Sequence, residues 1–357
     1  PPISLANAFA YESSEQLEKV FQNRAPGFAY TRIANPTVDA FERRVNELEG
    51  GIGGVACSSG MSAVTLSLLN ILQAGDEVIA GSALFGGTLD LLHDLEAFGI
   101  KVHFIPRVEM ALIEPFLTDK TRAVFGEIVG NPALNVMDVR ETADFLHGKG
   151  VPLIVDSTTS TPYLLNPIQY GADVVVHSTS KYINGSGDAI SGIIIDSGNF
   201  DWDAYGHKYH GLTEPDESYH GVVYTKQFGK KAYITKATTQ LMRDLGSIPS
   251  PENCFLLNLG LETLPLRVER HFENAQKVAE FLDAHEKVSH VIYAGLPNDK
   301  YHELAQKYMD KGRTCGVISF ELTGGRDAAV RFMDSLKLAN IATHVAASKT
   351  MVLHPAS

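Results

Sequence analysis

The sequence is poor in cysteine and tryptophan, with three cysteines and one tryptophan in 357 residues. The cysteines are Cys57, Cys254 and Cys315, which are far apart in the chain and odd in number. That spacing supports neither a disulfide framework nor a metal site. We therefore expect reduced, mostly buried thiols, as in a cytoplasmic protein.

Positive charge and long apolar runs are also scarce. The chain has 30 Lys and Arg against 42 Asp and Glu, a formal net charge of −12, which argues against nucleic-acid binding through a basic face. No apolar run approaches the roughly 20 residues that a membrane-spanning helix needs. An apolar content of 44% and a charged content of 20% are ordinary for a globular enzyme. No leader is recognisable, although residue 1 is Pro1, which leaves the natural start open.

Short apolar strands alternate with amphipathic helices through the first two thirds of the chain. Asn35-Pro36-Thr37 predicts a helix start, and the apolar face of that helix is expected to consist of Val38, Phe41, Val45 and Leu48. The alternation predicts an α/β fold with a mostly parallel sheet covered by helices on both faces. The expected strands lie near 55–57, 77–80, 101–105, 123–127, 151–156, 173–177 and 192–195, and the expected helices at 36–50, 61–72, 87–98 and 141–148.

The character of the sequence changes at about Gly246, and we expect a second, smaller α+β domain from there. Its expected helices cover 264–284, 301–309 and 327–335, and its expected strands cover 288–293, 316–322 and 351–353. The predicted division is therefore an N-terminal arm at 1–36, a large domain at 37–245 and a C-terminal domain at 246–357.

Lys181 comes shortly after an expected strand that no charge interrupts after Asp173. The strand at 173–177 is rich in β-branched residues, and Ser178, Ser180 and Lys181 come directly after it. A lone lysine after a strand is ordinarily a surface lysine, but burial beside a sheet would lower its pKa and favour the neutral amine. A neutral amine can form a Schiff base with a carbonyl group. Asp156 ends the strand before it, and a lysine with a nearby carboxylate suits pyridoxal 5′-phosphate (PLP), whose pyridine nitrogen takes an acidic partner.

Further polar and small residues also fall at expected strand ends. The strand near Val55 leads through VACSSGM into a helix, and the backbone N–H groups of Gly60 and Met61 are expected to cradle a phosphate. Ser178 and Ser180 can add hydroxyl donors. Asn131 follows the strand at 123–127. Because ligands of open α/β sheets bind outside the carboxyl ends of the strands, these residues are expected to meet in one site.

The segments VDSTTSTP and GADVVVHSTSKYINGSGD resemble the signature of the PLP-dependent enzymes of cysteine and methionine metabolism. The resemblance runs from Tyr30 to the end of the chain. It implies PLP-dependent transferase fold type I, with Lys181 holding the cofactor, Asp156 at the pyridine nitrogen and Asn131 at the phenolic oxygen of the ring.

The resemblance also assigns roles to residues of two further motifs. In the YTRIANPT motif, the resemblance implies that Tyr30 and Arg32 bind the cofactor phosphate of a neighbouring subunit, in a homotetramer built from dimers with shared active sites. A tyrosine usually precedes the paired glycines of ALFGGTLDLL, but here the residue is Phe85. Phe85 keeps a stacking face for the ring and lacks the phenolic acid. Its alternative interpretation is simple core packing.

The C-terminal third carries signals of a branch within the family. GNFDW, RDLG, GLETLPLRVERHFENA, YAGLP and KTMVLHPAS resemble O-acetylhomoserine sulfhydrylases. The resemblance implies replacement of acetate on O-acetyl-L-homoserine by a sulfur nucleophile, giving L-homocysteine in methionine biosynthesis. Alternatives are a methionine or cystathionine γ-lyase, a cystathionine γ-synthase, or a PLP-binding protein without turnover. The sulfur donor and the choice between acetyl and succinyl esters stay open.

The arginine that binds the substrate carboxylate in this family lies beyond Ser357. We therefore expect the natural chain to continue past that residue.

Overall fold

The computed structural model describes residues 2–22 and 24–354. Its centre is a seven-stranded sheet in the order β1-β7-β6-β5-β4-β2-β3, with β7 antiparallel to both of its neighbours and all other pairs parallel. The predicted α/β class with a mostly parallel sheet is confirmed. The strands are β1 (Gly53–Cys57), β2 (Glu77–Gly81), β3 (Lys101–Ile105), β4 (Thr121–Glu127), β5 (Leu153–Asp156), β6 (Val174–His177) and β7 (Gly192–Asp196).

Helices cover both faces of this sheet, and each face has its own apolar core. Alternate residues of one strand point to opposite faces, so that Ile193 and Ile195 belong to one core and Ile194 to the other. The first core is covered by α2 (Pro36–Glu49), α5 (Met110–Ile113), α6 (Val139–His147), α7 (Thr161–Leu164) and α12 (Pro251–Glu262). The second core is covered by α3 (Gly60–Leu69), α4 (Gly86–Glu96), α8 (His210–Thr213), α9 (Tyr224–Phe228) and α10 (Ala232–Lys236).

Helix α2 starts where its sequence predicts. The side chain of Asn35 accepts a hydrogen bond from the backbone N–H of Thr37 at 2.9 Å, and Pro36 occupies the first turn. Gly50 ends the helix in the left-handed conformation, at φ 73°. Val38, Phe41 and Val45 are buried as expected, but the expectation for Leu48 is wrong, because 45% of it is exposed. The register of the helix turns its last apolar residue out of the core.

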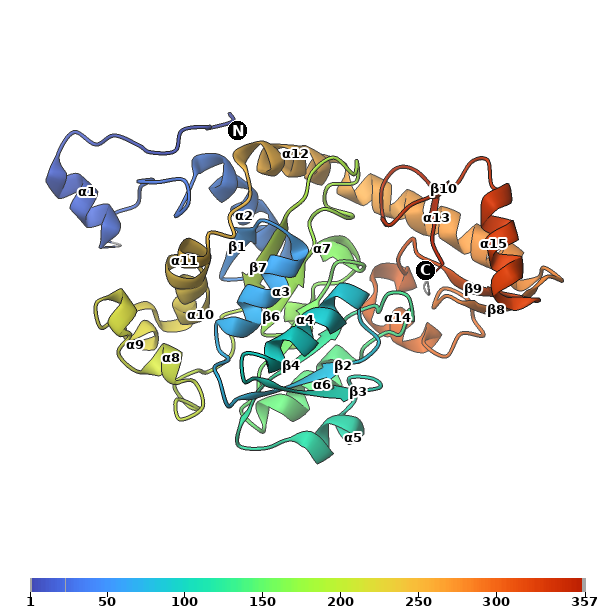
Figure 1. The fold of residues 1–357 in the computed structure, drawn as a ribbon, viewed down its shortest axis with the longest axis horizontal. Coiled ribbons are helices and arrows are strands. Elements are labelled where there is room, and N and C mark those ends of the chain that lie inside the picture. The colour runs from blue at the N-terminus through green and yellow to red at the C-terminus, as the bar shows by residue number, and fades with distance from the viewer. Residues whose placement is uncertain (1, 23, 355–357) are drawn as a thin grey trace.

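Several helical segments have no counterpart among the predicted elements, and the longest of them is α12. The N-terminal arm contains α1 (Ser14–Phe21), which has no buried residue. After β7, the chain forms a helical group of α8, α9, α10, a π-helical turn at Ala237–Met242 and α11 (Arg243–Leu245). Figure 1 shows this group on one side of the sheet and the C-terminal elements on the other.

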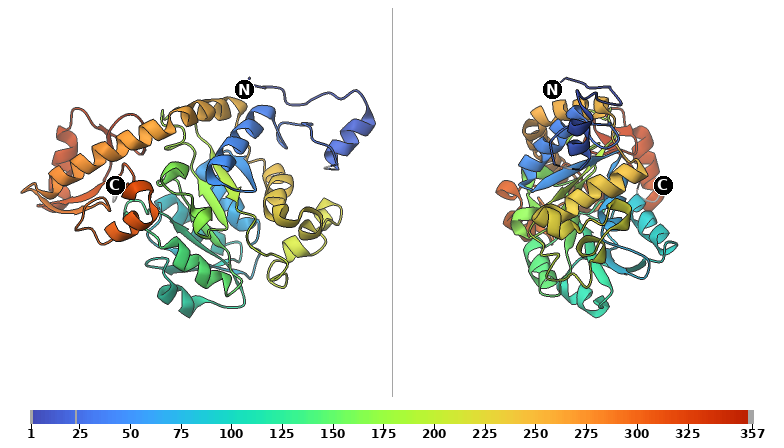
Figure 2. Two further views of the ribbon diagram at one scale, coloured as in Figure 1. Left: turned by 180° about the vertical axis from the view of Figure 1, so that it is seen from behind. Right: turned by 90° about the vertical axis from the view of Figure 1, so that its left-hand side faces the viewer.

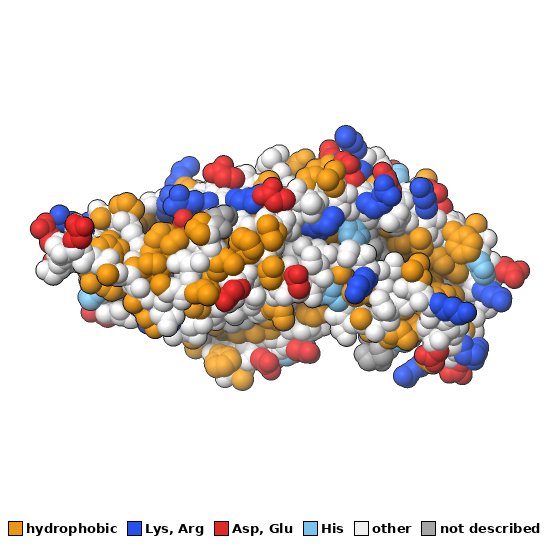
Figure 3. Space-filling model, turned by 90° about the horizontal axis from the view of Figure 1, so that it is seen from above, with side chains coloured by type: hydrophobic (Ala, Val, Ile, Leu, Met, Phe, Trp, Pro, Cys, Tyr) orange, Lys and Arg blue, Asp and Glu red, His pale blue; other side chains and the backbone are white. Residues whose placement is uncertain are grey.

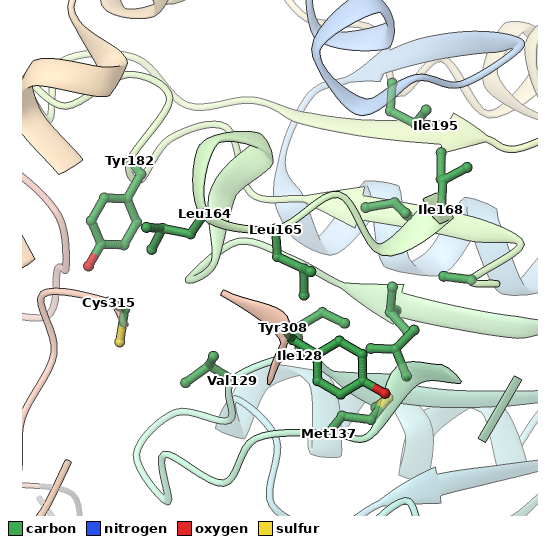
Figure 4. Close-up of a cluster of buried hydrophobic side chains, with 14 of the residues drawn as sticks. Ile128, Val129, Met137, Leu164, Leu165, Ile168, Tyr182, Ile195, Tyr308 and Cys315 are labelled. Carbon is green, nitrogen blue, oxygen red and sulfur yellow. The ribbon is translucent and has the colours of Figure 1, made fainter. Parts of the chain in front are cut away.

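The C-terminal elements follow the long helix α13 (Leu264–Asp283), and the left view of Figure 2 shows them at one end of the molecule. Some of their apolar side chains join the first core of the large sheet, where Tyr308 lies among Ile128, Met137 and Leu165 (Figure 4). The others form a smaller core of their own, which includes Ala279, Val291 and Tyr293. The remaining helices are α14 (His302–Tyr308) and α15 (Gly325–Ser335). The remaining strands form two small sheets, β8 (Val288–Ile292) with β9 (Ser319–Leu322), and β10 (Asn340–Ile341) with β11 (Met351–Val352).

Candidate active site

Lys181 lies four residues after β6, at the carboxyl edge of the sheet, and is partly buried. Burial lowers the pKa of its amine, as the sequence predicts. The Nζ atom lies 3.3 Å from Nδ1 of His344, a residue of the loop between β10 and β11. The structure therefore presents an amine with weakened basicity at the point where neighbouring parallel strands end.

Asp156 ends β5, the strand beside β6, and pairs in register with Val176. Burial raises the pKa of its carboxyl group, whereas a 2.8 Å hydrogen bond from the backbone N–H of Thr158 and the nearby His177 lower it. His177 is itself buried, and its Nε2 lies 2.6 Å from Oε1 of Glu49 in α2, within hydrogen-bond distance. The carboxylate of Asp156 thus lies at the same sheet edge as Lys181, where it can favour a positive charge on a bound ring.

The expected phosphate cradle lies against the lysine segment. Ser59 caps α3, and its hydroxyl accepts from the backbone N–H of Ser62 while the Ser62 hydroxyl accepts from that of Ser59. A side chain at Gly60 would place its Cβ 2.5 Å from the Cβ of Ser178, so only glycine allows this approach. The start of α3, which includes Met61, is therefore brought within contact distance of Ser178.

Ser180 has a different set of partners from the one expected. Its Oγ atom donates to the carbonyl of Ser191 at 3.1 Å and accepts from the Ser191 N–H at 3.0 Å. The hydroxyl thus ties the lysine segment to the residue before β7. In this structure Ser180 fixes the loop around Lys181, and its hydroxyl proton is directed to Ser191.

Glu127, at the end of β4, joins two of the expected ring-facing residues and was missed by sequence reasoning. Its Oε1 accepts from the backbone N–H of Phe85 at 2.7 Å, and its Oε2 accepts from that of Asn131 at 3.0 Å. Glu127 pairs in register with Asp156 on β5. Its pKa is raised to about 8, mainly by burial and to a smaller extent by the negative charge of Asp156. A cavity of about 290 Å³ lies beside it, lined also by Leu84, Asn135 and other residues. The available signal was a carboxylate ending an apolar strand, as at Asp156.

Phe85 stands directly before α4 and is 48% exposed. A Cβ at Gly87 would lie 2.8 Å from its ring, so the paired glycines leave room for the aromatic side chain. This exposure does not fit the alternative of simple core packing. The exposed face leaves the ring free to stack on a ligand.

Tyr30 and Arg32 contact each other and a different part of the chain. The guanidinium of Arg32 lies 5.5 Å from the centre of the Tyr30 ring and donates to the carbonyl of Arg243 at 2.6 Å. Tyr30 is 41% exposed. Within one chain, these contacts hold the two residues beside α11 rather than at Lys181.

The structure confirms the burial of all three cysteines, which are free thiols. Within residues 2–22 and 24–354, no group of three or more His, Cys, Asp or Glu side chains is arranged to hold a metal ion. In this same part of the chain, no helix is both long enough and apolar enough to cross a bilayer.

Comparison with known proteins gives a consistent set of matches. A family model described as "Cys/Met metabolism PLP-dependent enzyme" matches residues 1–357. The O-acetyl-L-homoserine sulfhydrylase of Leptospira meyeri is 42% identical, over 100% of this chain and 82% of that protein. The homocysteine synthase of Schizosaccharomyces pombe is 40% identical, over 99% of this chain and 83% of that protein.

A solved structure from Campylobacter jejuni, described as an O-acetylhomoserine (thiol)-lyase with N′-pyridoxyl-lysine-5′-monophosphate, has a TM-score of 0.96. It is 34% identical and is matched over 100% of this chain and 88% of that one.

Proposed function

Because the chain belongs to the Cys/Met metabolism PLP-dependent enzyme family, we propose that it is an O-acetyl-L-homoserine sulfhydrylase. It replaces the acetate of O-acetyl-L-homoserine with sulfur, so that a C–O bond breaks, a C–S bond forms, and L-homocysteine and acetate leave. The observation that carries the proposal is the meeting of Lys181, Asp156 and the Gly60 segment at one sheet edge. The sulfhydrylases and homocysteine synthases that match this chain over nearly its whole length support the choice of reaction.

The residues at the sheet edge fit PLP. The amine of Lys181 has a lowered pKa, the carboxyl group of Asp156 is placed on the adjacent strand, and Gly60 opens a helix start against Ser178. Lys181 would hold the cofactor, Asp156 would face its pyridine nitrogen, and Gly60 with Met61 would bind its phosphate. When bound, PLP supplies an electron sink that stabilises negative charge on the amino-acid substrate.

The side chains at this edge of the sheet have different roles in the proposed reaction. The amine of Lys181, once free, can accept and return protons of the substrate, since burial favours its neutral form. Asp156, at the end of the strand adjacent to β6, would bind the pyridine nitrogen of the ring. Phe85 and Asn131 would contact the ring, and Glu127 holds the backbone of both through its two oxygens.

Phe85 favours an ester substrate, from which a carboxylate departs. A thiol has a pKa of about 8.5 and leaves poorly without a proton donor, whereas a carboxylic acid with a pKa near 4.3 leaves as the anion. General acid catalysis at a leaving sulfur is worth roughly 10²- to 10⁴-fold. Phe85 has no acidic proton to give, which suits acetate and disfavours the thioether substrates of a lyase.

We further propose a homotetramer built from two dimers, in which Tyr30 and Arg32 serve the cofactor phosphate of a neighbouring chain. The exposure of Tyr30 and the position of Arg32 beside α11 support this role. Apolar side chains gather on the face viewed in Figure 3, which is the side of α12 and the arm. Leu259 of α12 and Leu266 of α13 are 52% and 70% exposed, as expected for residues that a second chain covers.

The buried free thiols support the cytoplasm as the location of the enzyme.

The deciding experiment is an assay of the purified protein with PLP, O-acetyl-L-homoserine and sulfide. We expect homocysteine and acetate in equal amounts, and little 2-oxobutyrate from methionine or cystathionine. Parallel assays with O-succinyl-L-homoserine and with a protein-bound thiocarboxylate would identify the ester and the sulfur donor. Efficient elimination from methionine or cystathionine, with no homocysteine formed, would replace this proposal with the γ-lyase.

A further inference from the structure

The loop between β10 and β11 contacts the segment that follows Lys181. The backbone N–H of Ser348 donates to the carbonyl of Gly185 at 3.1 Å. Gly185 in turn donates to the carbonyl of Lys181 at 2.8 Å. Nε2 of His344 lies 3.5 Å from the position that a Cβ of Gly187 would take. The C-terminal loop and the segment that follows Lys181 are therefore packed directly together.

A second set of contacts makes this junction rigid. Arg267 of α13 donates to the carbonyls of Tyr182 at 2.7 Å and Ile183 at 3.3 Å. The hydroxyl of Tyr182 accepts from the backbone N–H of Gly316 at 2.7 Å, and Figure 4 shows its ring extending toward Cys315. The residue that follows Lys181 is thus held at both its carbonyl and its side chain by C-terminal elements.

His344 is the residue of this loop that reaches the reactive group. Its Nδ1 lies 3.3 Å from Lys181 Nζ, and its Nε2 is buried with no hydrogen-bond partner among residues 2–22 and 24–354. Burial and the charge of Lys181 both lower the pKa of the imidazole, which favours its neutral form. With the hydrogen on Nε2, a neutral imidazole offers the Nδ1 lone pair to an N–H of the lysine amine.

We propose that His344 is a positioning residue for Lys181, and this rests on the proposed role of Lys181 as the cofactor lysine. Nδ1 accepts one N–H of the amine and holds it at the sheet edge whenever the amine is not bonded to the cofactor. The lone pair of Nζ then stays available for attack on a carbonyl or for a proton of the substrate. A lysine side chain has a flexible four-carbon stem, so one fixed hydrogen bond removes much of its rotational freedom before reaction.

The test uses three variants of the full chain that change the imidazole in matched ways. In His344→Asn the side-chain amide takes approximately the place of Nδ1, whereas in His344→Gln it takes that of Nε2. His344→Leu keeps the bulk and removes both nitrogens. The first readout is the rate at which cofactor-free protein regains the visible absorbance of the lysine–cofactor bond after PLP is added. Lys181→Ala supplies the blank.

We expect His344→Asn to recover absorbance at a rate near that of the wild type, and His344→Gln and His344→Leu to be about 3- to 10-fold slower, as the loss of one hydrogen bond implies. In steady-state assays of the same two variants, kcat should fall by a similar factor while KM changes little. Equal rates for all four proteins, or an Asn variant as slow as the Leu variant, would overturn the proposal. If His344→Leu does not fold, the comparison of Asn with Gln still decides.

Failure of the proposed function is a separate result. A protein that forms no homocysteine but shows the Asn-versus-Gln difference in absorbance recovery would keep the role of His344 and lose the assigned reaction. A protein that forms homocysteine with identical recovery rates in every variant would keep the reaction and lose the role of His344.

Discussion

Replacing Glu127 by Gln tests whether this carboxyl group organises the ring-facing side of the site. Burial raises the pKa of Glu127 to about 8, so near neutral pH the native group is mostly uncharged and Gln matches its charge and shape. The amide NH₂ cannot accept a hydrogen bond, so the N–H of either Phe85 or Asn131 loses its acceptor. The substitution therefore isolates one hydrogen bond.

The expected magnitude follows from these contacts. A buried N–H without an acceptor costs about 1–3 kcal/mol. Because the amide oxygen of Gln still accepts one of the two N–H groups, only one is left without an acceptor, and we expect the Gln variant to lose about 1 kcal/mol. Glu127→Ala frees both N–H groups and should cost about 2–3 kcal/mol. If either ring-facing loop shifts, kcat/KM for O-acetyl-L-homoserine should fall about 5- to 10-fold in the Gln variant.

Asp196 supplies a matched control at the opposite edge of the sheet. It is buried and accepts the backbone N–H groups of Gly198 at 2.8 Å and Ile234 at 3.3 Å. Because β7 is antiparallel, Asp196 pairs with Val174, the first residue of β6, and so lies away from Lys181. Asp196→Asn should lower the free energy of unfolding in urea and leave kcat/KM unchanged, whereas Glu127→Gln should lower both. Glu127→Gln with wild-type kcat/KM would refute the reasoning.

Four further outcomes are expected. Asp156→Asn should still bind PLP but lose roughly 10²- to 10³-fold in kcat, as when a preorganised electrostatic partner is removed; near-normal turnover would contradict its role. Phe85→Tyr should raise kcat/KM for cystathionine elimination more than for acetate replacement, and equal effects on both reactions would dismiss the leaving-group argument. Burial raises the pKa of Asp196 from its ordinary 3.8 to about 7. The protonated carboxyl group therefore stabilises the folded protein by up to about 4 kcal/mol below pH 3.8, and this stabilisation is lost as the pH rises to 7. The free energy of unfolding in urea should fall over this pH range in the wild type, and this part of the fall should be absent in Asp196→Asn. Mixing inactive Arg32→Ala and Lys181→Ala proteins should restore some activity through hybrid sites, and no recovery after proven subunit exchange would count against sharing.

The alternation of apolar strands and helices was enough to predict the fold class. A strand that helices cover on both faces of the sheet is apolar at consecutive positions, and this pattern is visible in the sequence. Each strand of the large sheet was predicted to within a few residues, and the Asn35 cap marked the start of α2. The direction of β7 was not predicted, since a run such as Gly192–Asp196 is equally apolar in either orientation. The helical group after β7 was also missed, because its short helices lack a long periodic pattern.

The candidate site likewise has one part that the sequence predicts and one part that only the structure shows. The meeting of Lys181, Asp156 and Gly60 at one edge could be predicted from the sequence, because each ends an apolar strand or comes within four residues of its end, and parallel strands end at the same edge of the sheet. Glu127 was identified only from its two hydrogen bonds, one of which joins it to a loop 42 residues earlier in the chain. His344 lies 163 residues from Lys181, in a loop with no strand-end pattern of its own. Which distant side chain meets the lysine amine depends on how the C-terminal elements pack against the large sheet, and only the tertiary structure decided that.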